Sequence, residues 1–255
     1  MGFSIVDNIV TVDHSHNKFA NTTVSYNPTK MVHSNELTIY SAFRRFRIKD
    51  RKRGQSAKRL KGDNCPMIYA IKGKDGLSTT YKDIYSLNLN LLSIIEKFKD
   101  SQPYDLIIPL PSRHNISSII SRRLHRALPG SILNQQLLRK INLFEAKASI
   151  HNSKIDIKDK RHIEDALSKQ IKDNGGSIFA PYSVKDLKVA LRDCIPPITL
   201  NKPTKGLNPN TIVLVDDVVS SGTSMLSAYS ILKSLYPDAT IIGFSLFSST
   251  ITKHS

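Results

Sequence analysis

The amino-acid sequence predicts an α/β protein with a parallel central sheet and helices on both faces. Two apolar runs rich in β-branched residues, within 104–112 and 211–217, each lead through a polar loop into a segment with apolar residues at helical spacing. The order strand, loop, helix, strand recurs through the second half of the chain, as in parallel sheets. We expect a core over residues 101–255 and a smaller extension over residues 1–100.

The composition indicates a cytoplasmic protein with polyanionic partners. The chain has 255 residues, enough for one α/β domain of ordinary size and an appendage. Cys65 and Cys194 show no metal-binding or redox spacing, which fits a reducing compartment. Neither a signal peptide nor an apolar run long enough for a membrane span is evident, so we expect no membrane contact. The net charge of +16 favours phosphates or nucleic acid as ligands.

The first hundred residues combine weak patterns with two clearer ones. Residues 1–40 contain short apolar patches that predict short strands or turns. The segments 67–71 and 77–81 flank a turn with two glycines, which predicts a β-hairpin. Apolar residues at helical spacing then predict a helix over 84–98.

A dense basic run covers residues 43–61, in which Asp50 is the only acidic residue. Two interpretations stay open. Such a run is often a solvated segment, and it is also typical of a nucleic-acid contact in which aromatic residues stack on bases. The candidate nucleic-acid contacts are Arg44, Arg45, Arg47, Arg51, Lys52 and Arg53.

The first core strand is expected within 104–112, where two prolines end regular pairing. The loop that follows leads into a helix beginning near Ile116. This loop consists of Ser112, Arg113, His114 and Asn115. It offers backbone N–H groups beside a guanidinium, although Ser112 or Asn115 could equally serve as a simple helix cap.

Further strands are expected at 132–138 and 240–247, with a helix after Ser183. Residues 139–173 form a polar, charged insertion with helical pieces near 161–171. Its basic residues include Lys154, Lys158, Lys160, Arg161 and His162.

The segment 211–225, TIVLVDDVVSSGTSM, carries the strongest functional signal. An apolar strand ends in Asp216 and Asp217, and the loop after it opens directly into a helix. The loop residues are Ser220, Ser221, Gly222, Thr223 and Ser224. A helix amino terminus binds anions through unpaired N–H groups, whereas two carboxylates would repel a bare phosphate. A ligand that carries both phosphate and hydroxyl groups, such as a sugar phosphate, satisfies both features.

Residues 212–224 resemble the signature of the type I phosphoribosyltransferases, which bind 5-phosphoribosyl-1-pyrophosphate (PRPP) together with Mg²⁺. The resemblance implies that Asp216 and Asp217 hold the ribose hydroxyls and that the 220–224 loop holds the 5-phosphate. It further implies that the loop 112–115 binds pyrophosphate. By position, the insertion 139–173 is where the loop that closes over PRPP in this family is expected, with Lys154, Lys158, Lys160, Arg161 and His162 as its candidate residues. A P-loop is a poorer match, because no G-x-x-x-x-G-K-[ST] pattern occurs.

The implied activity is a Mg-dependent transfer of the ribosyl 5-phosphate group of PRPP to a nitrogen acceptor, with release of pyrophosphate. Residues 1–100 would then form the hood over the acceptor, as in orotate phosphoribosyltransferase. Ser220 stands where the hypoxanthine-guanine enzymes have an aspartate base, which argues against a 6-oxopurine acceptor.

The alternative function is that of a PRPP-binding regulator or nucleic-acid-binding protein, including an effector of a toxin or defence system. The acceptor stays open, as does the oligomeric state, for which a homodimer or membership of a larger complex is considered.

Overall fold

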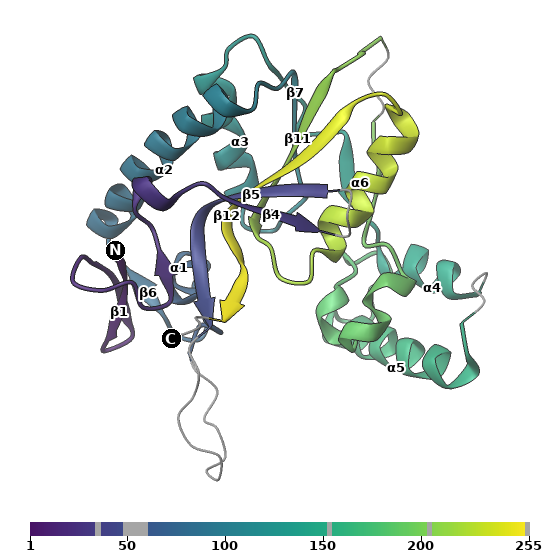
Figure 1. Cartoon of the computed structure of the whole chain (residues 1–255). Coiled ribbons are helices and arrows are strands. Elements are labelled where there is room, and N and C mark those ends of the chain that lie inside the picture. Colours follow the sequence, from purple (N-terminus) through teal and green to yellow (C-terminus); the bar gives the residue numbers. More distant parts are fainter. Residues whose placement is uncertain (34–36, 48–60, 152–154, 203–205, 253–255) are drawn as a thin grey trace.

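The computed structural model describes residues 1–33, 37–47, 61–151, 155–202 and 206–252 (Figure 1). Its strands are β1 (Gly2–Val6), β2 (Ile9–Asp13), β3 (Ala20–Asn21), β4 (Thr29–His33), β5 (Leu37–Arg47), β6 (Ser78–Thr79), β7 (Leu106–Pro109), β8 (Ile132–Leu133), β9 (Leu138–Lys140), β10 (Ile198–Leu200), β11 (Thr211–Val218) and β12 (Thr240–Thr252). Its α-helices are α1 (Pro66–Ile71), α2 (Tyr81–Ser101), α3 (Ile116–Ala127), α4 (Leu143–His151), α5 (Ile157–Asp173) and α6 (Thr223–Leu235). Short 3₁₀ helices are η1 (Val24–Tyr26), η2 (Val184–Asp186) and η3 (Val189–Cys194).

The main sheet has seven strands among the described residues, in the order β3-β5-β12-β11-β7-β8, with β4 also paired to β5. The five strands from β8 to β5 run parallel to their neighbours, whereas β3 and β4 pair antiparallel with β5. The sheet is therefore mixed: the predicted parallel strands are joined at one edge by two antiparallel strands that were not predicted. The α/β class with helices on both faces is confirmed.

The strand order creates a topological switch point between β7 and β11. After β7 the chain crosses through α3 to β8 on one side, and after β11 it crosses through α6 to β12 on the other. Ligands of open α/β sheets bind at such a point, outside the carboxyl ends of the two strands. The loops after β7 and β11 are the two that the sequence singled out.

Strand β11 is buried on both faces, as its continuous apolar run predicted. Val213 and Val215 pack in a core with α1, α2 and α3, whereas Ile212 and Leu214 pack in a second core with α6. Alternate side chains of a strand point to opposite faces. The side chain of Asp217 consequently lies on the same face of the sheet as α1. That of Asp216 lies on the opposite face, near the end of the strand.

The predicted hairpin over 67–81 was wrong. Residues 66–71 form α1, which begins with Pro66 in its first turn, and β6 pairs in parallel with β2 instead. A short apolar run fits a buried helical turn as well as a strand, because periodicity alone does not separate the two. The glycines of the turn, Gly73 and Gly76, both adopt positive φ after the helix.

Strand β5 belongs to the amino-terminal hundred residues, yet it lies inside the main sheet. It pairs in parallel with β12, with Phe43 opposite Phe247. Helix α2 also packs on the sheet, where the ring of Phe98 lies 4.8 Å from that of Phe244. The extension predicted as 1–100 thus contributes to the same hydrophobic core as β11.

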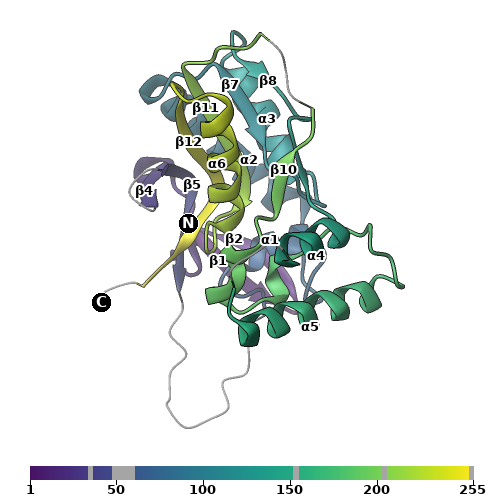
Figure 2. The same cartoon turned by 90° about the vertical axis from the view of Figure 1, so that its right-hand side faces the viewer.

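The insertion between β8 and β11 has a small core of its own. Helices α4 and α5, with η2 and η3, bury Leu143, Ile163, Tyr182 and Ile195. Figures 1 and 2 show α4 and α5 beside the carboxyl edge of the sheet, away from α2. Among the described residues no helix is both long and apolar enough to cross a bilayer.

Candidate ligand-binding site

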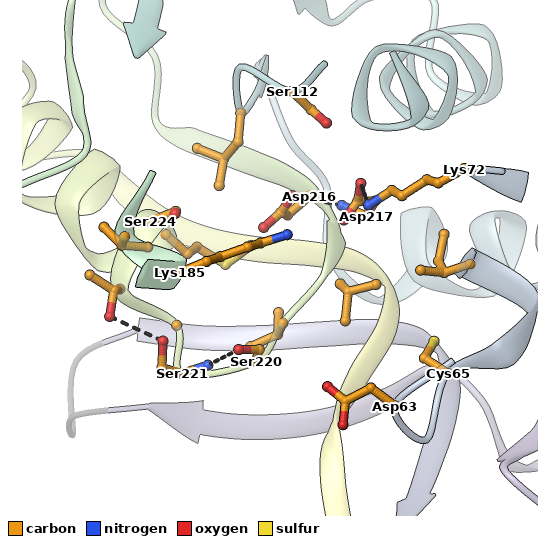
Figure 3. Close-up of a pocket in the computed structure, with 18 of the residues that line it drawn as sticks. Asp63, Cys65, Lys72, Ser112, Lys185, Asp216, Asp217, Ser220, Ser221 and Ser224 are labelled. Carbon is orange, nitrogen blue, oxygen red and sulfur yellow. Dashed lines mark hydrogen bonds and ion pairs between the residues drawn. The ribbon is translucent and has the colours of Figure 1, made fainter. Parts of the chain in front are cut away.

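A cavity of about 520 Å³ opens at the carboxyl edge of the sheet, at the switch point between β7 and β11 (Figure 3). The segments Leu110–Ser112 and Asp216–Met225 line it from the sheet. Further walls come from α1 and from the insertion. Six basic side chains and three carboxylates line the cavity, so its formal charge is positive and favours a polyanion.

Asp216 and Asp217 both reach the cavity, because β11 ends at the next residue. Asp217 is 7% exposed and forms an ion pair with Lys72, at 2.5 Å between Oδ2 and Nζ. Lys72 follows α1 directly, which explains why it meets the aspartate on that side of the strand. Figure 3 shows Lys185, from the insertion, extending toward Asp216 from the other side.

The two carboxylates affect each other. Burial at the strand end, together with the charge of Asp217, raises the pKa of Asp216 well above its usual range. The backbone N–H of Asp217, 2.8 Å from Asp216 Oδ1, opposes this rise only in part. Asp216 and Asp217 therefore form an acid pair whose full ionisation is unfavourable. Hydroxyl donors or a cation would reduce the repulsion between the two carboxylates.

This pair should leave a signature in the pH dependence of stability. A carboxyl whose pKa is raised on folding binds its proton more tightly in the folded chain, so stability falls as pH rises from about 4 toward neutrality. Asp216→Asn is expected to remove this fall and to raise the free energy of unfolding at pH 7 by about 1–2 kcal/mol. Thermal unfolding between pH 4 and 8 measures the effect. If stability of the variant still fell with pH as steeply as that of wild type, groups other than Asp216 would cause the pH dependence.

The loop after β11 has the strand-loop-helix context predicted for a phosphate site. Gly222 has φ +79° and precedes α6, whose first turn begins at Thr223. The hydroxyls are organised: Ser220 Oγ accepts from the N–H of Ser221 at 2.7 Å, and Ser221 Oγ lies 3.1 Å from Thr223 Oγ1. Thr223 also donates to Asp193 of η3, which links the loop to the insertion.

The last residue of β4, His33, contacts the backbone of this loop. His33 Nε2 lies 3.0 Å from the carbonyl oxygen of Ser221. A carbonyl can only accept, so Nε2 carries the proton. Because the peptide between Ser221 and Gly222 is trans, its N–H points away from His33. A phosphate on the far side of the loop from β4 can accept that N–H and those of the first helical turn.

The loop after β7 reaches the cavity only in part. Ser112 lines it, whereas Arg113 and Asn115 are exposed and His114 is half-buried. Asn115 has φ +51° at the N-cap of α3, and its side chain makes no capping hydrogen bond. Desolvation and the charges of Lys72, Lys74 and Arg113 lower the pKa of His114. These residues therefore gather at the rim of the cavity beside Lys72 and Lys74.

Sequence reasoning missed most of the basic residues of the cavity. They are Lys72, Lys74, Lys140, Lys185 and Arg192. Lys72 and Lys74 flank a glycine in what looked like an ordinary hairpin turn, and the other three are scattered through the insertion. No local pattern distinguishes them from surface residues, because only the tertiary fold brings them to one cavity.

The basic residues predicted as candidates for a loop that closes over the ligand do not line the cavity in the part of the chain that the structure describes. Lys154 falls outside the described residues. Lys158, Lys160, Arg161 and His162 lie on α5, and none of these four lines the cavity. His162 Nε2 instead lies 2.7 Å from Lys188 Nζ. The insertion borders the site through Lys140, Val184, Lys185, Arg192 and Ile198.

The basic run 43–61 is described only up to residue 47. Arg51, Lys52 and Arg53 lie outside the described residues, and for Arg47 only the backbone in β5 is described. Arg44 is half-buried over the ring of Phe46, at 5.5 Å from guanidinium carbon to ring centroid. Arg45 is 7% exposed and lines the cavity, so it does not form part of an outer surface.

The chain was also compared with known proteins. Neither the models of known protein families nor the curated proteins give a significant match.

Proposed function

We propose that the cavity binds PRPP with Mg²⁺ and that the protein is a phosphoribosyltransferase that uses a nitrogen acceptor. One observation carries the proposal. At the switch point of the sheet, two adjacent carboxylates precede a hydroxyl-rich loop at a helix amino terminus, from which two valines separate them. They lie in a cavity with an excess of basic side chains. A sugar that bears hydroxyls between two phosphate groups matches this order of charges.

The residues divide into three groups toward such a ligand. The loop 220–224 would receive the 5-phosphate, and Asp216 and Asp217 would accept hydrogen bonds from the ribose hydroxyls. Ser112, Arg113, His114 and Asn115, beside Lys72 and Lys74, would face the pyrophosphate. Lys72 would exchange its bond to Asp217 for the pyrophosphate oxygens, which leaves Asp217 free for the sugar.

In the reaction, the bond between ribose C1 and the pyrophosphate oxygen breaks, and pyrophosphate leaves with the electron pair. The acceptor nitrogen supplies the pair for the new bond to C1, and its proton passes to the departing pyrophosphate. Positive charge develops on the ribose ring and negative charge on pyrophosphate. Fixed carboxylates on one side and fixed cations on the other stabilise this separation, and they act most strongly when solvent is excluded.

Mg²⁺ fits the donor set as an ion brought by the ligand. Among the described residues no group of three or more His, Cys, Asp or Glu side chains is arranged to hold a metal. Mg²⁺ commonly binds through substrate phosphates, water and one or two carboxylates. Asp216 and Asp217 would be carboxylates available to such an ion, which would neutralise charge on the leaving pyrophosphate.

Calorimetric titration of Mg-PRPP into the intact protein tests the proposal. We expect saturable binding of one PRPP per chain that excess ribose 5-phosphate or pyrophosphate displaces. Purine bases, pyrimidine bases and amine donors are then added to the complex one at a time. We expect one of them to trigger release of pyrophosphate. Absence of binding to the folded protein would refute the proposed ligand.

A second candidate function is a PRPP-responsive regulator that contacts nucleic acid. The exposed side of α3 favours it, because Arg122, Arg123 and Arg126 gather there around Ile119. Such a cluster suits phosphate contacts that position a duplex without reading its sequence. Binding of Mg-PRPP without pyrophosphate release for any acceptor would favour this candidate over the enzyme.

A further inference from the structure

Arg45 is a buried cation that forms no ion pair with any of the residues that the structure describes. Its side chain is 7% exposed and lies on the cavity wall, at the strand β5 that borders β12. Its guanidinium donates to the carbonyl of Val219, at 3.2 Å from Nη2, and its Nε has no acceptor. None of the ion pairs formed by the described residues includes Arg45.

The groups around Arg45 do not supply the missing charge. Burial raises the pKa of the neighbouring Cys65 thiol to about 11, so the thiol is neutral at physiological pH. Asp217 is already paired with Lys72, and among the described residues no other carboxylate that lines the cavity lies within ion-pair distance of Arg45. A buried charge is strongly unfavourable unless it is paired or well hydrogen-bonded. The cavity wall at Arg45 is therefore poised for an anion that enters from the cavity.

The position of Arg45 indicates which anionic end of the ligand it would contact. Val219, whose carbonyl it binds, directly precedes the loop 220–224, and both Arg45 and this loop line the same cavity. The planar guanidinium offers several N–H donors, which suit phosphate oxygens. Lys72, Lys74 and Ser112 lie toward the other loop, after β7, and would serve the opposite end of the ligand.

We propose that Arg45 is a direct ligand of the phosphate group held by the 220–224 loop, and thus a specificity residue for sugar 5-phosphates. This inference rests on the proposed function only for the identity of the sugar. The rest of the argument does not need that function, because the buried guanidinium has no ion-pair partner among the described residues and lies beside the 220–224 loop. It also gives Arg45 a role inside the cavity, in place of the surface contact with nucleic acid considered from the sequence.

The test compares wild type with Arg45→Gln and Arg45→Lys by calorimetry, with ribose 5-phosphate as the probe. Loss of charge-assisted hydrogen bonds should make binding to Arg45→Gln about 10- to 100-fold weaker, and Arg45→Lys should fall between it and wild type. The matched control is Arg44→Gln, which removes one charge from the adjacent, opposite side of β5 and does not line the cavity. It should bind like wild type.

Thermal unfolding separates a ligand role from a structural one. Without ligand, Arg45→Gln should melt no lower than wild type, because it removes an uncompensated buried charge. With saturating ribose 5-phosphate, wild type should gain more in melting temperature than the variant. A variant that fails to fold, or that melts lower while it binds ribose 5-phosphate unchanged, would overturn the inference and assign Arg45 a packing role.

The outcomes distinguish this inference from the proposed function. Binding of ribose 5-phosphate that depends on Arg45, without binding of Mg-PRPP, would retain the phosphate ligand and refute the transferase. Equal binding of Mg-PRPP by wild type and Arg45→Gln would retain the proposed substrate and refute the role of Arg45.

Discussion

A chain in which asparagine replaces both Asp216 and Asp217 is expected to bind Mg-PRPP about three orders of magnitude more weakly and to lose transfer. Each carboxylate would accept a charge-assisted hydrogen bond from a ribose hydroxyl, worth about 1.5–3 kcal/mol. An asparagine amide presents one oxygen and no charge, and it can orient its donor toward the sugar. Calorimetry and pyrophosphate release measure the two effects.

The loss should not come from unfolding. Neutral side chains at 216 and 217 remove the repulsion that raises the pKa of Asp216, although Lys72 then loses its partner. We expect the melting temperature to change little, which circular dichroism can check. The matched control is Asp63→Asn, which removes a carboxylate from the cavity wall away from β11. If the double variant still bound Mg-PRPP as tightly as this control, the sugar site would have to lie elsewhere.

Gly222→Ala is expected to lower the free energy of unfolding by about 2–4 kcal/mol and to weaken phosphate binding at least tenfold. Two effects add. Gly222 has φ +79°, which costs an L-residue about 1–2 kcal/mol. A Cβ there would also lie 2.5 Å from His33 Nε2, and displacing His33 breaks its bond to the carbonyl of Ser221.

Two comparisons separate these effects. Gly76 has φ +66° with no atom within 4 Å of an added Cβ, so Gly76→Ala measures the backbone strain alone. Adding His33→Ala to Gly222→Ala should restore part of the stability by removing the steric contact. Chemical denaturation gives the free energies, and titration with ribose 5-phosphate gives the affinities. If Gly222→Ala were as stable as Gly76→Ala, the displacement of His33 would not lower the free energy of unfolding.

The site strand and its loop were predictable because their information is local. An unbroken apolar run fits a strand buried on both faces, and β11 packs in two cores. A loop of small hydroxyl residues before a helical pattern marks the start of α6. The place of the two carboxylates in the site was also predictable, because adjacent side chains can approach one ligand where a strand ends.

The rest of the cavity was not predictable for an equally physical reason. Lys72 meets Asp217 because α1 packs on one side of β11, and Lys185 arrives through an insertion with its own core. Arg45 sits in a run of arginines that reads as solvated. Its burial depends on the pairing of β5 with β12, which are about two hundred positions apart along the chain. Local charge density carries no information about such a partner.

The position of β12 also affects how the protein is made. Strand β5 emerges early in synthesis and finds its antiparallel partners β3 and β4 at once, but its parallel partner is the last strand of the sheet. Until β12 emerges, the nascent chain carries an open strand edge that bears Phe43 and Arg45, the kind of edge that invites wrong pairing. Closing this edge brings Arg45 to the loop after β11. Completion of the sheet and completion of the anion site are thus the same late event of folding.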